Sequence, residues 1–178
     1  WVQLHPWLKA CLTFCYGTLE LFLLLTLIVL IVYRRYTLLY EYYSLLVISA
    51  CIGYAIYYFF PTTAPASIVQ SPYFLERQYA TGLKFNQLHQ YQLQTTSEGG
   101  LIAFPSFHII WTWLLVYAVR CWPMALIACS FYGMMVTFAC VLLGWHYWVD
   151  ILGSVAVLAL TYSLERYFIY GKPYLFRR

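Results

Sequence analysis

The sequence predicts an all-α membrane protein: a polytopic bundle of five membrane-spanning helices, forming a single domain over residues 1–178. Hydrophobic residues make up 63% of the chain and charged residues only 9%, whereas soluble domains carry roughly 25% charged residues. Aromatic residues reach 21%, and many flank apolar segments, as they do in the interfacial belts of membrane proteins. Such a chain cannot cover itself with a polar surface, so the bilayer is its expected surroundings.

Five apolar segments come close to the ~20 residues that a helix needs to cross a bilayer. A long loop at 61–104 separates the second segment from the third. Within this loop, apolar and polar residues interleave over 72–93, a pattern that indicates an amphipathic helix at the membrane interface. Because the chain begins at Trp1 rather than at methionine, we allow for a sixth span upstream. The expected spans are 12–33, 39–60, 106–121, 124–143 and 147–169.

Basic residues orient these spans in the membrane. Arg34 and Arg35 follow the first span, and Arg120 follows the third. Those that end or follow the fifth span are Arg166, Lys172, Arg177 and Arg178. A five-span alternation places all of them on one side, which the positive-inside rule makes cytoplasmic. Loop 61–104 therefore faces away from the cytoplasm, and we expect an integral protein of the cell's inner or plasma membrane.

Three ionisable residues lie at span ends on the non-cytoplasmic side. His108 opens the third span, while His146 and Asp150 open the fifth. The spacing of four residues between His146 and Asp150 places both on one face of a helix, where a carboxylate can fix the tautomer of an imidazole. Ionisable groups at the edge of a bilayer are costly, which indicates a function. The topology, derived from Arg and Lys alone, thus predicts a candidate active site on one side.

The strings around these three residues resemble two motifs of the type 2 phosphatidic acid phosphatase superfamily, which comprises polytopic lipid phosphatases and phosphotransferases. Pro105-Ser106-Phe107-His108 resembles the Pro-Ser-Gly-His motif, and His146-x-x-x-Asp150 resembles the end of the third motif. Phe107 in place of glycine, preceded by Phe104, is similar to the branch that contains inositol phosphorylceramide synthase and its bacterial relatives. The resemblance covers roughly residues 39–169.

The resemblance implies a lipid phosphatase or phosphotransferase that acts on a lipid phosphate ester at the extracytoplasmic face. By this likeness, His146 attacks phosphorus and forms a phosphohistidine, and Asp150 orients it. His108 protonates the leaving alkoxide. Ser106 binds a phosphate oxygen through its hydroxyl or through its backbone N–H at a helix N-terminus. The expected partners are membrane lipids, and no metal or other cofactor is implied.

The chain also departs from the family pattern. Ala139 and Cys140 stand where the third motif carries Ser-Arg, and nothing matches the first motif, Lys-x6-Arg-Pro; the nearest string, 61–66, has no arginine. After the second span, Arg77 and Lys84 are the permanently basic residues left on the non-cytoplasmic side. We therefore expect the loop to fold over the site, with both residues binding phosphate or an anionic head group. The alternative is that both only contact anionic lipids.

Other functions and simpler interpretations stay open at this point. A net charge of +4 is spread along the chain, so no nucleic-acid partner is expected, and the cysteine spacing predicts no metal cage. His108 and His146 are also suited to a membrane haem or proton-relay protein, as axial ligands. The missing arginines favour a lipid-binding scaffold without catalysis. Structurally, the His146–Asp150 pair can tie helices together, and Ser106 can cap a helix.

Overall fold

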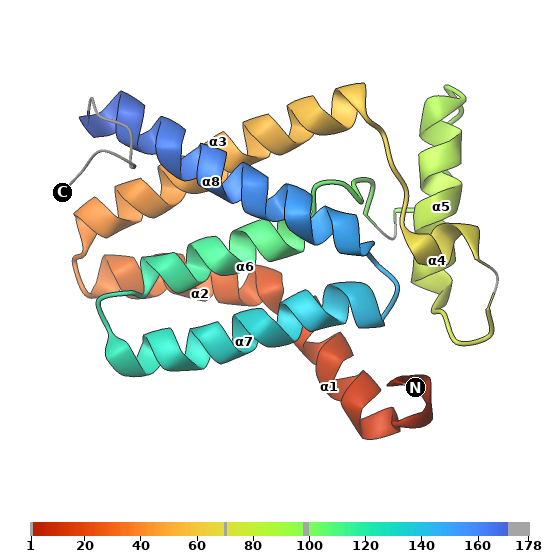
Figure 1. Cartoon of the computed structure of the whole chain (residues 1–178), viewed down its shortest axis with the longest axis horizontal. Coiled ribbons are helices and arrows are strands. Elements are labelled where there is room, and N and C mark those ends of the chain that lie inside the picture. The colour runs from red at the N-terminus through yellow and green to blue at the C-terminus, as the bar shows by residue number, and fades with distance from the viewer. Residues whose placement is uncertain (1, 70, 98–99, 171–178) are drawn as a thin grey trace.

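In the computed structural model, which describes residues 2–69, 71–97 and 100–170, all regular structure is helical (Figure 1). Most of the helices lie side by side in a bundle, and α4 and α5 lie at one of its ends. The elements are η1 (Val2–Leu4), α1 (Pro6–Gly17), α2 (Leu19–Val32), α3 (Tyr36–Phe59), α4 (Pro65–Ile68), α5 (Glu76–His89), α6 (Phe107–Ala118), α7 (Pro123–Leu142) and α8 (Trp148–Tyr170). The basic residues expected at 172, 177 and 178 lie outside the described residues.

The described helices provide three to four membrane spans. Helices α3, α7 and α8 are each long and apolar enough to cross a membrane, and α1 with α2 qualifies as one span bent by 48°. Helix α6 has only 12 residues, fewer than the ~20 that a complete crossing needs. It begins after Ser106, whose side chain caps it, and it ends before Pro123 starts α7. The predicted count of five spans is therefore not confirmed.

Helix α6 is the centre of the bundle. It packs against α2, α3, α7 and α8, and Ile110 and Leu114 are fully buried in a core that also includes Leu30, Leu45 and Val157. Burying a leucine or isoleucine side chain contributes roughly 1.5–3 kcal/mol. Because four helices enclose α6, its first turn, which follows the 61–104 segment directly, is held in place.

A cluster of polar side chains ties three parts of the bundle together; we call Glu41, Tyr117, Arg120 and Arg166 the Glu41 cluster. Arg120 Nη2 lies 2.6 Å from Glu41 Oε2, and the Tyr117 hydroxyl donates to Glu41 Oε1 at 2.6 Å. Arg166 Nη2 donates to the Tyr117 hydroxyl at 3.0 Å. These residues belong to α3, to the end of α6 and to α8. The cluster thus joins the bundle at the end away from α4 and α5 (Figure 1).

The 61–104 segment folds back over the other end of the bundle. Helices α4 and α5 pack on each other beside the start of α8 (Figure 1). Gln78 Nε2 donates to Leu143 O at 2.8 Å, and Ala66 N donates to Gly144 O at 3.1 Å. The helix expected over 72–93 is shorter, at Glu76–His89. Its inner face is anchored to the turn that precedes α8.

Candidate active site

The segments that carry the two motifs are in direct contact. Ser106 N donates to Ser154 Oγ at 3.0 Å, and Ser154 Oγ in turn donates to Asp150 O at 2.6 Å. The ring of Phe104 lies so close to Gly153 that any side chain at this position would overlap it. The absence of a side chain at Gly153 therefore allows the start of α8 to approach the segment before α6.

His146 is held by hydrogen bonds at both ring nitrogens. Its Nδ1 lies 2.8 Å from Ala103 O and 3.3 Å from Asp150 Oδ2. Both of these partners accept, so Nδ1 carries the hydrogen and Nε2 carries the lone pair. The hydroxyl of Ser106, 3.0 Å away, donates to Nε2. His146 and Asp150 are 5% and 2% exposed, so the network fixes the ring and leaves Nε2 as its basic atom.

The expectation that His146 and Asp150 share a helix face is wrong, although the two side chains do meet. Helix α8 begins two residues after His146. Asp150 Oδ2 accepts the Tyr147 N–H at 2.8 Å, and the His146 N–H bonds to Cys140 O at 2.9 Å. Gly144 has a φ of +81°, a left-handed conformation that glycine adopts readily. A tight turn, rather than helical spacing, therefore brings the imidazole to the carboxylate.

Ser106 lies behind His146 and does not line the cavity described below. It is completely buried, and its Oγ accepts the Ile109 N–H at 3.4 Å as the N-cap of α6. Its own backbone N–H is bonded to Ser154. The sequence placed the hydroxyl and the N–H of Ser106 on a phosphate oxygen, but the structure directs both to neighbouring protein atoms.

Asp150, His146 and Ser106 follow one another in the order of a serine-hydrolase triad. In such an enzyme the serine oxygen must reach the substrate, whereas Ser106 has no exposed surface. His146 lines the cavity and Ser106 does not. The geometry therefore favours His146, rather than Ser106, as the residue that meets a substrate.

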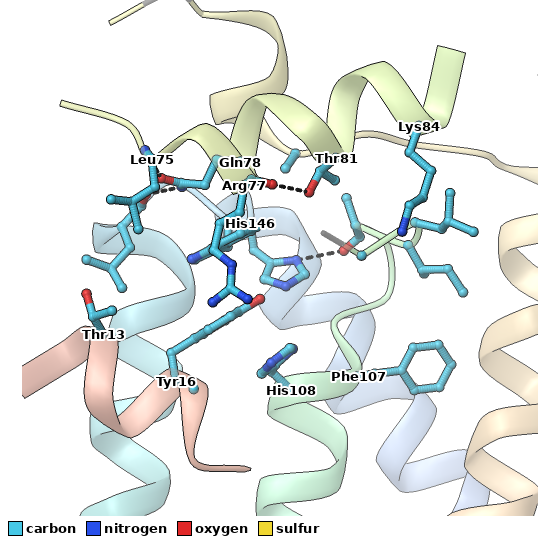
Figure 2. A pocket seen from close by; sticks show the side chains of 18 of the residues that line it. Thr13, Tyr16, Leu75, Arg77, Gln78, Thr81, Lys84, Phe107, His108 and His146 are labelled. Atoms are coloured by element: carbon cyan, nitrogen blue, oxygen red, sulfur yellow. Dashed lines mark hydrogen bonds between the residues drawn. The ribbon is translucent and has the colours of Figure 1, made fainter. Parts of the chain in front are cut away.

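A cavity of about 820 Å³ lies between α5 and the bundle, within the range of ~300–1,000 Å³ that small-molecule sites have. Figure 2 shows His108 and His146 on its lower side and α5 above them. The ring centroids of the two histidines are 6.5 Å apart. His108 is bonded to no described residue through its ring nitrogens. The two predicted catalytic histidines therefore face one cavity, one hydrogen-bonded to protein at both nitrogens and the other at neither.

A family model described as the PAP2 superfamily matches residues 1–164. The chain belongs to the PAP2 superfamily. This makes it a membrane protein of the phosphatase type, and the match includes all three predicted catalytic residues. No curated protein and no solved structure matches the chain, so the family assignment rests on this model.

The position that carries the PAP2 motif arginine is occupied by a buried cysteine in this protein. Cys140 is 0% exposed and packs against Ile109 and Val136. Its Sγ lies 3.9 Å from Ser106 Oγ, on the side of Ser106 that faces the core. Position 140 does not line the cavity, so positive charge at the cavity must come from other segments.

Arg77 supplies positive charge from α5. Its side chain points into the cavity toward Tyr16 (Figure 2). Among the described residues, its guanidinium has no hydrogen-bonded or ion-paired partner. A cation that faces a cavity without a protein partner is free to bind an anionic group of a ligand.

Two lysines complete the positive lining of the cavity. Lys84 lines it as predicted, is only 8% exposed, and donates to Ser97 O at 3.0 Å. Lys9, which the sequence interpretation missed, also lines it and donates to Tyr73 O at 3.1 Å. The signal for Lys9 was available, since the residue precedes the first span and the charge rule puts it on the side of the loop. Both amines thus bond to backbone oxygens at the edge of the cavity.

Among the described residues, no group of three or more His, Cys, Asp or Glu side chains could hold a metal ion. His108 and His146 are thus a pair of imidazoles accompanied by one carboxylate. The chemistry that these residues offer is nucleophilic attack and proton transfer.

Proposed function

We propose that this PAP2 protein is a membrane lipid phosphatase or phosphotransferase that forms a phosphohistidine on His146. One observation carries the proposal: the hydrogen-bonded imidazole of His146 and the imidazole of His108 face the same cavity beneath Arg77, and among the described residues neither the His108 ring nor the Arg77 guanidinium has a hydrogen-bonded partner. The family membership supports a reaction of the phosphatase type, and the geometry of the cavity supports the roles proposed for His146, His108 and Arg77.

In the first step, Nε2 of His146 attacks phosphorus while the bond from phosphorus to the leaving oxygen breaks. The leaving oxygen takes the electron pair and receives a proton from His108. Asp150, beside Nδ1, stabilises the positive charge that develops on the ring of His146. To free the lone pair of Nε2, the hydroxyl of Ser106 rotates away from it. Ser106 and Asp150 therefore act through His146.

In the second step, an acceptor hydroxyl loses its proton to His108 and attacks the phosphohistidine. The nitrogen–phosphorus bond breaks, and His146 recovers its lone pair. Water as the acceptor makes the protein a phosphatase, whereas a lipid hydroxyl makes it a phosphotransferase. The ring centroids of His108 and His146 are 6.5 Å apart and both side chains line the cavity, which supports their acting on one phosphate ester.

The charge of the phosphoryl group is offset by cations from the N-terminal helix and from α5. Arg77 suits this role best because a guanidinium can bind two phosphate oxygens at once, and because it has no partner among the described residues. Lys9 and Lys84 add positive charge from the edge of the cavity. These residues take the place of the arginines that the family motifs carry elsewhere.

The orientation and the span count belong to the same proposal. The cavity faces away from the cytoplasm, because the α2–α3 connection with Arg34 and Arg35, and the α6–α7 connection with Arg120, lie at the other end of the bundle (Figure 1). The chain then crosses the membrane five times, with α1 and α2 as one bent span and α6 as a short one.

Leu93, 92% exposed in the 61–104 segment, is a suitable labelling position. In a background without native cysteines, Leu93→Cys reacts with an impermeant maleimide in intact cells; reaction only after lysis reverses the orientation.

We also propose which branch of the family the chain is nearest to, on the basis of Phe107. Phe107, at the motif position of glycine, fills the space beside Gly53 on α3 and contacts Tyr54 and Trp111. Aromatic walls of this kind suit a lipid acceptor. We therefore place this chain nearest the branch that resembles inositol phosphorylceramide synthase.

The test uses purified protein in detergent with three substrates: phosphatidic acid, an isoprenyl diphosphate, and phosphatidylinositol with ceramide. Release of phosphate from either of the first two, or formation of a phosphorylated ceramide from the third, supports the proposal. The control is His146→Ala, which removes the nucleophile. Equal product from wild type and His146→Ala, or product from neither, contradicts it. A strong visible absorbance of the same sample supports the haem alternative.

A further inference from the structure

Tyr16, in the last turn of α1, belongs to neither family motif but contacts the catalytic end directly. Its ring is stacked on that of His108, with centroids 3.9 Å apart and an interplanar angle of 10°. It is also stacked on Trp145, at 5.1 Å and 6°. Figure 2 shows Tyr16 beside His108, with its hydroxyl end beneath Arg77. Tyr16 is thus common to two parallel ring pairs, one of which includes a catalytic histidine.

His108 depends on this stack for its orientation. Its ring nitrogens bond to no described residue, whereas His146 is fixed by hydrogen bonds to Ser106 and Ala103 and by the carboxylate of Asp150 at 3.3 Å. A single bond joins an imidazole to its Cβ, so the ring can turn unless a neighbour blocks it. A nearly parallel ring at 3.9 Å blocks that rotation. The stack therefore fixes the plane in which the His108 ring faces the cavity.

Tyr16 itself is held firmly, as a positioning residue requires. The chain bends at the end of α1, where Tyr132 of α7 donates to Cys15 O at 2.8 Å and lies 3.3 Å from Thr18 Oγ1. Leu12, one turn before Tyr16, is 1% exposed and packs against α7. The bend thus fixes the ring of Tyr16 relative to α7 and to the turn that carries His146.

We propose that Tyr16 is a positioning residue for proton transfer: its ring holds His108 with a nitrogen directed at the leaving oxygen. This inference rests on the proposed function, in which His108 protonates that oxygen. It also gives the N-terminal helix a part in the chemistry. The property that matters is the flat ring, so Tyr16→Phe retains the effect and Tyr16→Leu loses it.

The experiment compares two leaving groups in the same detergent preparation. Phosphatidic acid releases an alkoxide that needs a proton, whereas a long-chain nitrophenyl phosphate releases a phenolate that leaves without one. The measured quantity is the ratio of kcat/KM for the two substrates. This ratio does not depend on the fraction of folded protein, so it remains informative for a variant that folds partially. Phe14→Leu is the matched control, because Phe14 lies on the same helix and is 65% exposed.

For Tyr16→Leu we expect kcat/KM on phosphatidic acid to fall about tenfold or more, a part of the ~10²–10⁴ that a general acid contributes. The rate on the nitrophenyl ester stays close to wild type, and Tyr16→Phe and Phe14→Leu keep the wild-type ratio. His108→Gln gives the largest change in the ratio. If no Tyr16→Leu protein is obtained, Trp145→Leu removes the second stacked ring and shifts the ratio in the same direction.

Three outcomes contradict the inference. An unchanged ratio in Tyr16→Leu, or in Trp145→Leu where that variant replaces it, means that the ring does not position His108. An equal loss in Tyr16→Phe means that the hydroxyl matters instead. In both cases wild-type activity leaves the proposed function intact. Hydrolysis of neither ester by the wild type overturns the proposed function, and this inference with it.

Discussion

The two ends of the bundle both carry ionisable side chains, but these side chains differ in their hydrogen-bond and ion-pair partners. In the Glu41 cluster, a carboxylate 6% exposed meets two arginines and a tyrosine hydroxyl within 2.6–3.4 Å. At the cavity end, Arg77 and the ring nitrogens of His108 have no partner among the described residues. Ion pairs between side chains hold helices together, whereas charged groups directed into a cavity can bind a ligand.

The same comparison separates two kinds of histidine at the cavity end. His146 is fixed by Ala103, Asp150 and Ser106, as a nucleophile must be if its lone pair is to point in one direction. His108 is stacked on Tyr16, and neither of its nitrogens bonds to a described residue, as suits a group that gives and takes protons. Four predictions test whether the cavity end is functional and the Glu41 end structural.

The largest expected effect is on turnover. His146→Ala should lower kcat by about 10⁴-fold or more, because the covalent step is lost. Phosphate release from the preferred lipid, measured in detergent, checks this. The protein should still elute as a single species in size-exclusion chromatography, since Asp150 keeps the hydrogen bond from the Tyr147 N–H. Retained turnover would place the reaction elsewhere in the molecule.

The next effect is on stability. Glu41→Ala should cost about 3–5 kcal/mol, because it removes the ion pair of Arg120 and leaves Arg166 with Glu165 alone, at 3.7 Å. Denaturant titration in mixed micelles measures the change. Glu76→Ala, on the exposed surface of α5, is the matched control and should be nearly neutral. The specific activity of the Glu41→Ala protein that remains folded should match wild type; a selective loss of kcat would give this cluster a catalytic role.

Arg77→Ala is the converse case, with an effect on catalysis and none on folding. Removing one group that stabilises transition-state charge typically costs about 10²-fold in kcat, and we expect a similar loss of kcat/KM. The midpoint of thermal unfolding should stay at the wild-type value, because the guanidinium has no partner among the described residues. Arg77→Lys should recover part of the activity. Wild-type kcat/KM in Arg77→Ala would mean that phosphate is held without it.

The smallest effect is expected at the edge of the cavity. Lys9→Met should lower kcat/KM only a few-fold, because the amine already donates to Tyr73 O and its field is screened by salt. The loss should shrink as ionic strength rises. A loss as large as that of Arg77→Ala, unchanged by salt, would place Lys9 in direct contact with the reacting group.

The sequence predicted the meeting of His108, His146 and Asp150 because the motifs and the charge alternation gave independent reasons for one location. It also predicted that the loop after the second span covers the site, because Arg77 and Lys84 in this loop were the permanently basic residues left on that side after the second span. These predictions depend on local patterns and on topology, and both can be read from the sequence without knowledge of tertiary contacts.

The rest depended on tertiary contacts that leave no local pattern. Tyr16 is one of 19 tyrosines, and its position against His108 arises from the bend between α1 and α2. Ser106 was expected at the phosphate, but the packing of α8 turned its hydroxyl to His146. The third span expected at 106–121 begins with the Ser106 cap, where α6 begins, but it runs past the end of α6 at Ala118, because the chain turns there before Pro123 starts α7.

The central claim is a covalent phosphoryl group on His146, and the most direct measurement is to trap it. Wild-type protein is mixed with phosphorus-labelled lipid phosphate, quenched rapidly in alkali, digested and analysed by mass spectrometry. The account predicts a phosphoryl group on the peptide that contains His146, stable in alkali, lost in mild acid and absent from His146→Ala. An acid-stable phosphoryl group on Ser106, or no labelled peptide from a preparation that turns over the lipid, would contradict it.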